Sequence, residues 1–466
     1  MIRNRTQPQE SRKASRRAIL GWILFDWACQ PYFTLLMTFI YAPYFASAVV
    51  GDPARGQSLW GFATAGAGVF IACTSPVLGA VADATGRRKP WIASFGVLIV
   101  IGASLLWLGK PGDPSTILPV LVAFAIGSIG VEFATVFNNT MMPLLVPREK
   151  IGSLSGAGWA MGYVGGMISL LFSLAFLASN PDTGHTLLGI PPIFGLDAAA
   201  REGDRATGPL TALWFFVFVI PLFLFTPDGK RGKPFVPAIR HGVNALKATF
   251  LEARKHRNLG YFLLANMIYT DGLLALFAFG GIYGAGTLGW ETMQLGLFGI
   301  LLTITGTFGA YFGGKLDDKI GAKAVVLGSL TVLVFCCLGI LSVSRDSIFF
   351  VVPVDPPQPG AGLFSSVPEK FYLILGALIG AVAGPVQAAS RTLLVRLSPP
   401  DRLAQFFGLF ALSGKITSFL GPFLVATVTA FTASQKAGIS VLVAFFFVGG
   451  LLLARAQISA GSGARP

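Results

Sequence analysis

The sequence predicts an all-α integral membrane protein with twelve transmembrane helices, arranged as two pseudo-symmetric six-helix bundles. Three observations lead to this fold class. Of the 466 residues, 53% are hydrophobic and only 12% are charged, whereas soluble domains carry about 25% charged residues. Apolar runs of about 20 residues, long enough to cross a bilayer, recur along the whole chain. A polar motif occurs once in each half, which indicates a duplicated unit.

The repeated motif is a short hairpin between two apolar runs. One copy extends from Gly79 to Lys89 and the other from Gly314 to Lys323, roughly half the chain apart. Each has a Gly, an acid four residues later, a second Gly three residues after the acid, and a base two residues further on. Glycine permits a tight turn, and bases stay at the membrane surface. The predicted hairpin residues are Gly79, Asp83, Gly86, Arg87, Arg88, Gly314, Asp318, Gly321 and Lys323.

Charge distribution argues against a nucleic-acid-binding protein, and cysteine placement argues against a disulfide or metal framework. The net charge of +14 would suit nucleic acid, but the bases lie at the ends of apolar runs and not along one polar face, so membrane topology explains them better and no nucleic-acid partner is expected. The four cysteines lie inside apolar runs without metal-ligand spacing, and they are predicted to be small core side chains: Cys29, Cys73, Cys336 and Cys337.

The apolar runs define the spans in order. The first run, 18–50, is too long for the apolar region of a signal peptide and contains Asp26, so we expect a retained helix. The other spans are expected at 58–82, 90–109, 116–146, 152–178, 209–226, 258–286, 292–314, 324–345, 371–396, 403–431 and 437–456. In the fifth of the twelve, glycines recur at steps of three and four residues, a spacing typical of close helix packing.

The spans divide the chain into five parts: an N-terminal tail (1–17), an N-terminal bundle (18–226), a basic linker (227–257), a C-terminal bundle (258–457) and a C-terminal tail (458–466). Of the 35 Lys and Arg residues, a minority lie in the loops of one side: Arg55, Lys110, Arg201, Arg205, Arg345, Lys370 and Lys436. Arg391 and Lys415 lie inside spans, and the others lie on the side of the N-terminus. The positive-inside rule therefore predicts that both tails and the linker are cytoplasmic.

The sequence contains no complete enzyme motif, and it predicts neither a cofactor nor a metal site. The three histidines lie in loops, so no span offers a histidine base or a histidine metal ligand. The segment from Gly408 to Lys415 resembles a phosphate-binding loop, but it has one residue too many between its glycines, and Ile416 replaces the required Ser or Thr.

Four ionisable residues inside the spans are the candidate site: Glu132, Asp271, Lys415 and Asp26. Such groups are costly in hydrocarbon, so they usually face a water-filled cavity or a charged partner. With a rise of about 1.5 Å per residue, Glu132, Asp271 and Lys415 are expected near the bilayer centre, and Asp26 at a shallower depth. Carboxylates that change surroundings as a cavity opens to alternate sides would bind and release protons. The alternative is a structural ion pair, such as Glu132 with Lys415.

Softer candidates for the cavity lining are the polar and aromatic residues close to these charges. Arg391 is expected close enough to the membrane surface for its guanidinium to reach water. The set is Trp27, Gln30, Tyr32, Asn138, Asn139, Tyr269, Gln387 and Arg391.

The hairpin, its partial repeat and the division into six and six spans resemble the major facilitator superfamily, over essentially the whole chain. The resemblance implies two bundles that rock around a central site and expose it to alternate sides. It also implies that Asp83, Arg87 and Arg88 bridge helix ends and stabilise the outward-open state. The second copy has Asp318 and Lys323 but lacks the paired arginines, so the resemblance implies less about its gating role.

Four further segments resemble the autophagy-associated vacuole-effluxer branch and its bacterial relatives: Gly21–Trp27, Gly158–Gly166, Tyr269–Gly272 and Ala411–Lys415. The resemblance implies a transporter of small polar solutes, with amino acids favoured. Together with the buried charges, it leads us to expect a proton-coupled secondary transporter that acts as a monomer in the bacterial inner membrane. Its expected partners are the lipid bilayer, a small-molecule substrate and protons. The alternatives are a carrier of sugars, drugs or lipid-like cargo, or a receptor or scaffold without transport.

Overall fold

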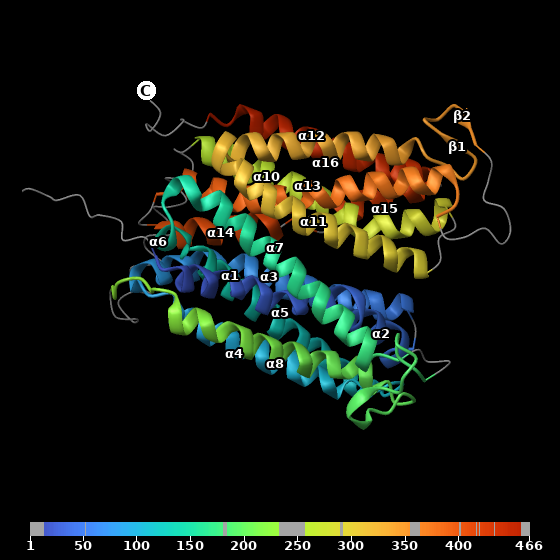
Figure 1. Cartoon of the computed structure of the whole chain (residues 1–466), viewed down its shortest axis with the longest axis horizontal. Coiled ribbons are helices and arrows are strands. Elements are labelled where there is room, and N and C mark those ends of the chain that lie inside the picture. The colour runs from blue at the N-terminus through green and yellow to red at the C-terminus, as the bar shows by residue number, and fades with distance from the viewer. Residues whose placement is uncertain are drawn as a thin grey trace, which may run out of the picture.

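A computed structural model describes residues 14–51, 53–179, 184–232, 257–288, 292–354, 364–399, 402–415, 417–418, 420–432 and 434–457. The chain folds into two groups of long helices that lie against each other (Figure 1). We call residues 14–232 the N half and residues 257–457 the C half. Most of the predicted linker and nearly all of both predicted tails lie outside the described residues.

The N half is built from helices that run back and forth along one direction. They are α1 (Arg16–Pro31), π-helix η1 (Tyr32–Phe39), α2 (Tyr41–Tyr44), π-helix η2 (Phe45–Val49), α3 (Pro53–Thr85), α4 (Lys89–Leu105), α5 (Ile117–Asn139), α6 (Met142–Leu145), α7 (Ile151–Phe172), π-helix η6 (Ser173–Leu177) and α8 (Glu202–Phe225). Short 3-10 turns cover Leu106–Leu108, Pro114–Thr116, Arg148–Lys150 and Ile193–Gly195.

The C half repeats this plan. Its helices are α10 (Arg257–Tyr283), π-helix η8 (Gly284–Leu288), α11 (Thr292–Ile320), α12 (Ala322–Leu341), α13 (Val367–Leu397), α14 (Leu403–Lys415), α15 (Leu420–Thr432) and α16 (Gln435–Arg455). A two-stranded antiparallel hairpin, β1 (Ser347–Ile348) and β2 (Val352–Pro353), lies in the connection from α12 to α13.

The helices account for the twelve predicted spans. Among the described residues, nine helices are long and apolar enough to cross a membrane, and Phe62–Ser75 with Val77–Thr85 forms a tenth that is bent by 47°. The remaining two predicted spans are broken into shorter pieces. The first is α1 followed by η1, α2 and η2, with Pro31 at the first break, where proline removes a backbone donor. The eleventh is α14 followed by α15.

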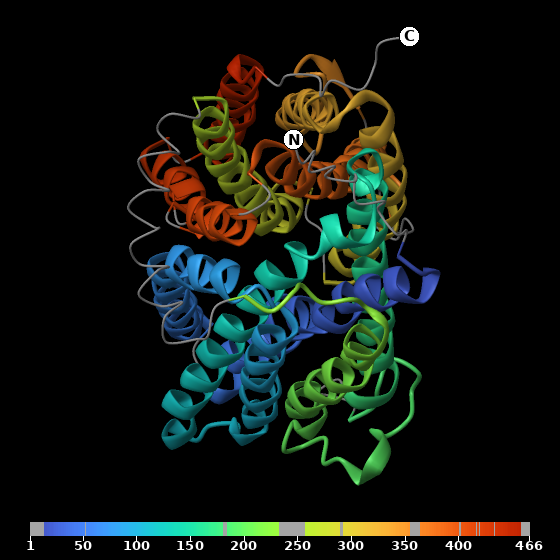
Figure 2. The ribbon, with the colours of Figure 1, turned by 90° about the vertical axis from the view of Figure 1, so that its left-hand side faces the viewer.

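One end of the molecule gathers the basic helix termini. Arg16 begins α1, Lys89 begins α4, Lys323 lies in the first turn of α12, and Arg396 and Arg455 lie in the last turns of α13 and α16. We call this end the basic end. Figure 2 looks onto it, with the N half below and the C half above.

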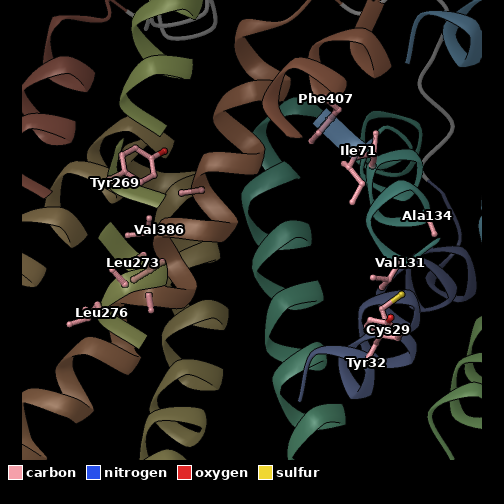
Figure 3. Packing of buried hydrophobic residues seen from close by; sticks show 14 of the residues in the cluster. Cys29, Tyr32, Ile71, Val131, Ala134, Tyr269, Leu273, Leu276, Val386 and Phe407 are labelled. Atoms are coloured by element: carbon pink, nitrogen blue, oxygen red, sulfur yellow. The ribbon is translucent and has the colours of Figure 1, made fainter. Parts of the chain in front are cut away.

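Two helix pairs make most of the contact between the halves in the described part of the chain. Helix α7 packs against α11, and α3 packs against α14, whereas α15 has its main contacts with α16 and α10 of its own half. Figure 3 shows Phe407 of α14 directed toward Ile71 of α3 within the shared hydrophobic core. The halves are therefore held together chiefly by α7, α11, α3 and α14, and α14 contributes the part of its span that begins at the basic end.

The glycines of the fifth span confirm the predicted close packing. Gly156 of α7 meets Gly314 of α11, and Gly158, Gly165 and Gly166 meet α1 on the opposite face of α7. Buried Cys29, Cys336 and Cys337 are core side chains as predicted. The same expectation is wrong for Cys73, which is exposed on α3 because its helix turns that face away from the core.

Replacing Gly156 with alanine is expected to loosen the contact between the halves. A Cβ there would lie 2.7 Å from the Cα of Gly314, and overpacking of this kind costs about 1–3 kcal/mol. We expect a lower thermal unfolding midpoint in detergent. Gly299→Ala is the matched control, because the nearest atom to its new Cβ, on Phe39, is 3.7 Å away. Equal effects of both substitutions would contradict the close packing at Gly156.

Candidate functional site

Arg391 of α13 extends from the C half into the N half and is the centre of a buried polar cluster. Its Nε donates to Ser155 Oγ at 2.8 Å, and its Nη2 donates to the Ser155 carbonyl oxygen at 2.7 Å. Its Nη1 donates to Asn139 Oδ1 at 2.8 Å and lies 3.4 Å from Asp26 Oδ2. One side chain of the C half therefore binds α7, α5 and α1 of the N half.

Aromatic rings and tight packing largely bury this cluster. The Arg391 guanidinium lies 5.3 Å from the ring centre of Trp22 and 6.0 Å from that of Trp159. The side chains of Arg391 and Asp26 are only 6% and 14% exposed. Any side chain at Gly158 would collide with Asp26, so the glycine lets α7 approach the ion pair. The expectation that Arg391 reaches water at the membrane surface is wrong, because its donors are used inside the protein.

Unused polar atoms lie on the elements that hold this cluster. The side-chain amide of Asn138 is fully buried, and neither its nitrogen nor its oxygen makes a hydrogen bond with the described residues. The indole N–H of Trp159 is also buried without a hydrogen-bond partner among the described residues. Farther along the interface, Gln387 Nε2 donates to the Tyr163 hydroxyl at 3.2 Å, again from the C half to the N half. The interface thus offers both charges and spare hydrogen-bonding groups to a polar ligand.

A second buried acid lies within the C half. Asp271 of α10 is 1% exposed, its Oδ1 has no hydrogen-bond partner among the described residues, and Thr417 lies near its carboxyl group. Thr417 lies in the break between α14 and α15, and Gly421 of α15 packs on the Asp271 backbone. Lys415 ends α14 two residues earlier, but its side chain lies outside the described residues.

The structure brings only some of the predicted site residues together. Arg391 binds both Asp26 and Asn139, and Asn138 is the sequence neighbour of Asn139. Asp271 lies against the first residues of α15 in the C half. Glu132 is half-buried on α5, and α5 also touches α14.

The remaining lining candidates mostly serve packing. Trp27 stacks on Trp214 of α8 with ring centres 5.5 Å apart. Gln30 packs on the glycines of α7. The Tyr32 hydroxyl donates to the Phe124 carbonyl oxygen at 2.7 Å, and the hydroxyls of Tyr269 and Ser390 are 2.6 Å apart.

The acid of the first hairpin caps a helix of the opposite half. Asp83 Oδ2 accepts from the backbone N–H of Gln405, the third residue of α14, at 2.9 Å. Asp83 Oδ1 accepts from Arg88 Nη2 at 2.6 Å, and Arg88 Nε donates to Thr140 at 3.0 Å. A carboxylate at a helix N-terminus satisfies an unpaired N–H and the positive end of the helix dipole. Asp83 therefore holds α14 against the N half.

The acid of the second hairpin does the same in the other direction. Asp318 Oδ2 accepts from the backbone N–H of Ser153, the third residue of α7, at 3.0 Å, and also from the Ser153 hydroxyl. Its neighbour Asp317 packs on Gly152 of α7 but has its polar partners in its own half, where it pairs with Arg396 Nη1 at 2.7 Å and accepts from the Thr392 hydroxyl. The second copy thus makes a contact between the halves without the paired arginines of the first.

The other hairpin residues shape the turns. Gly86 and Gly321 have φ of +76° and +87°, which only glycine adopts without strain. Gly79 and Gly314 are buried in α3 and α11. Lys323 Nζ donates to the carbonyl oxygens of Ala454 and Ala456 at 2.8 and 2.7 Å, and so closes the end of α16.

The start of the predicted linker, residues 228–232, is hydrogen-bonded to the first hairpin. Asp228 Oδ1 accepts from the backbone N–H groups of Arg88 at 2.7 Å and Gly229 at 2.8 Å, and the Gly232 N–H donates to the Thr85 carbonyl oxygen at 2.8 Å. Gly86 has no room for a side chain because a Cβ there would collide with the backbone of Lys230. Asp228 therefore fixes the backbone from which Arg88 reaches Asp83.

Sequence reasoning did not identify Ser153, Ser155, Asp317, Arg396 or Asp228 as site residues. Single serines and terminal charges carry no distinguishing pattern, and their partners come from other helices. The clearest available sign was the adjacent acid pair at Asp317 and Asp318, because neighbouring residues on a helix point about 100° apart and must face different surroundings.

A comparison with protein families identifies the family. Residues 57–464 match the family model described as vacuole effluxer Atg22 like. The chain belongs to this family. As an Atg22-like protein it is 23% identical over 439 residues to YxiO, an uncharacterized MFS-type transporter from Bacillus subtilis, and the match covers 93% of each chain. It is 27% identical over 313 residues to autophagy-related protein 22-1 from Penicillium rubens, of which it spans about half, 48%.

Solved structures agree on the fold of this Atg22-like protein. The major facilitator superfamily transporter FucP in its outward conformation matches with a TM-score of 0.65 at 14% identity, covering 95% of this chain and 99% of FucP. The human organic anion transporter MFSD10 matches with a TM-score of 0.65 at 16% identity, covering 96% and 100%. The fold is that of the major facilitator superfamily, and the predicted fold class of twelve helices in two bundles is confirmed.

Proposed function

We propose that this Atg22-like protein is a proton-coupled secondary transporter of small zwitterionic solutes, with amino acids favoured. The observation that carries the proposal is the buried pair of Arg391 and Asp26 between the two halves. An amino acid has one carboxylate and one ammonium group, and Arg391 and Asp26 offer the complementary charges side by side. The family description, vacuole effluxer, supports a transport function.

Such a ligand would compete with the ion pair. Its carboxylate would take the donors of Arg391, and its ammonium would take the oxygens of Asp26. Because Arg391 links the halves through Asn139 and Ser155, engaging it with substrate would weaken the contact that keeps the basic end closed. Binding and opening would then be coupled through one side chain.

Proton coupling is assigned to Asp271, with Glu132 and Lys415 as partners. Asp271 lies against Gly421, where the eleventh predicted span is divided between α14 and α15, and we assign a hinge to this division. Movement of α14 against α15 would change the surroundings of its unpaired oxygen. A carboxyl group whose surroundings alternate between dry and wet binds and releases a proton in step with the movement.

We place the basic end in the cytoplasm of a bacterial cell, with the chain as a monomer in the inner membrane and residues 227–257 as a cytoplasmic linker. The bases at this end support that orientation by the positive-inside rule. In it, the contacts of Asp83 and Asp318 close the cytoplasmic side, so the conformation is outward-facing. FucP, which has the same fold, was also solved in an outward conformation.

Transport by the purified chain in liposomes tests the proposal. Uptake of each labelled amino acid is measured with and without an imposed pH gradient, for the wild type, Glu132→Gln and Asp271→Asn. We expect the gradient to drive uptake in the wild type. In Asp271→Asn, we expect exchange of internal for external substrate to persist while the response to the gradient is lost. Glu149→Gln, a change of an exposed carboxylate, is the matched control.

Two results would overturn parts of the proposal. Uptake that ignores the pH gradient and survives both Glu132→Gln and Asp271→Asn would remove proton coupling. Uptake of sugars or lipid-like compounds from the same panel, but of no amino acid, would remove the substrate class. If no compound of the panel is taken up, transport itself is contradicted in favour of a receptor or scaffold.

A further inference from the structure

A cavity of about 510 Å³ opens beside the first hairpin at the basic end. Its lining comes from the turn before α4, the first residues of α4, the last turns of α8 and the segment 228–229 that follows α8. The lining residues are Arg87, Lys89, Pro90, Ala93, Phe223, Asp228 and Gly229. The cavity belongs to the N half alone, and it is far in sequence from the residues of the transport site.

The polar part of the cavity carries positive charge that is free to bind an anion. Arg87 is exposed and makes no hydrogen bond or ion pair in the described part of the chain. Lys89 Nζ donates one hydrogen bond to the Phe223 carbonyl oxygen at 2.8 Å, which holds the ammonium group at the cavity wall. Its other N–H groups remain available to a ligand. The one acid, Asp228, is turned to the backbone N–H groups of Arg88 and Gly229. Two bases therefore face the cavity, and the acid is already engaged.

The apolar part of the cavity continues into the outer surface of the bundle. Helices α4 and α8 lie side by side at the edge of the N half (Figure 1). Beyond Ala93 and Phe223, their outer faces carry exposed hydrophobic side chains, as expected for helix faces turned to lipid: Val97, Ile101, Leu213, Phe216, Val217, Ile220 and Leu224. A ligand of this cavity thus meets bases at the membrane surface and an apolar surface leading into the bilayer.

We propose that this cavity binds an anionic phospholipid of the leaflet at the basic end. The phosphate would lie between Arg87 and Lys89, and an acyl chain would follow the apolar faces of α4 and α8. Basic pockets between transmembrane helices are suited to such headgroups. Because Arg87 and Lys89 flank Arg88, which binds Asp83, the lipid would stabilise the hairpin that holds α14.

Lipid binding to the delipidated full-length chain tests the inference. The chain in mild detergent is titrated with micelles of phosphatidylglycerol, with micelles of phosphatidylcholine, or with free glycerol 3-phosphate, and bound lipid is measured by native mass spectrometry. We expect a clear preference for phosphatidylglycerol. In Arg87→Gln/Lys89→Gln that affinity should fall about thirty-fold, because each base near an anionic lipid contributes a factor of about five.

Two further variants separate this site from general attraction to a basic surface. Lys315→Gln/Lys319→Gln removes two exposed charges from the corresponding face of the C half and should leave binding unchanged. Ala93→Phe fills the cavity from an exposed position without changing charge, and it should lower binding as strongly as the double substitution. Equal affinity for the two phospholipids, equally tight binding of glycerol 3-phosphate, or equal losses in both double variants would overturn the inference.

Discussion

Arg391→Gln is expected to abolish transport and to destabilise the folded chain by about 3–5 kcal/mol. The substitution leaves Asp26 buried with its charge uncompensated, and breaking a buried pair by removing one partner costs about that much. It also removes the bonds from α13 to Ser155 and Asn139 that hold the halves together. The measurements are uptake by proteoliposomes and the thermal unfolding midpoint of the purified protein.

A double substitution separates the loss of function from the loss of stability. In Asp26→Asn/Arg391→Gln no buried charge is left alone, so we expect most of the stability to return while transport stays absent. Arg455→Gln, at an exposed position in the last turn of α16, is the matched control and should change neither quantity. If the double variant transports at the wild-type rate, the ion pair is structural only and the proposed substrate site is wrong.

Asp83→Asn/Asp318→Asn is expected to move the protein out of the state that is closed at the basic end. Each carboxylate caps a helix of the opposite half, and its negative charge at the helix N-terminus contributes up to about 1 kcal/mol that the neutral amide of asparagine lacks. Losing both would shift the balance between the two states by about 2 kcal/mol, or roughly thirty-fold. We expect transport to be impaired while substrate binding, measured by thermal shift or by equilibrium dialysis with labelled substrate, changes little.

Asp113→Asn is the matched control for this pair. Asp113 caps the short turn before α5 by accepting from the Ser115 N–H at 3.0 Å, entirely within the N half. Its loss should therefore affect neither transport nor the balance of states. Equal losses of binding and transport in Asp83→Asn/Asp318→Asn would indicate misfolding and would remove the assignment of these acids to a gate.

The pattern of the chain was sufficient to predict the architecture. Apolar length located the spans, and the repeated hairpin predicted the relation between the halves, because both follow from local sequence and from the cost of placing charge in lipid. The acids Asp83 and Asp318 were identified in the same way. The hairpin sequence alone could not predict which groups donate hydrogen bonds to these acids. The donors are the backbone N–H groups of Gln405 and Ser153, which belong to helices distant in sequence.

The candidate site was harder to predict because depth in the membrane does not fix direction. Arg391 lies about six residues from the end of α13, a distance from which it could reach water. Its actual direction is set by Asn139, Ser155 and Asp26 on three other helices. Equal estimated depth likewise gave no direction for Glu132, which is half-buried on α5, or for Asp271, which is buried on α10.

The account depends on the claim that Asp83 and Asp318 hold the basic end closed while the opposite end can open. Double electron–electron resonance between spin labels on cysteines introduced at Lys150 and Lys319, and separately at Leu108 and Phe431, measures both ends in a chain carrying Cys73→Ser. We expect a short distance at the basic end that lengthens in Asp83→Asn/Asp318→Asn, while the distance at the opposite end shortens. Unchanged distances, or lengthening at both ends, would contradict the claim.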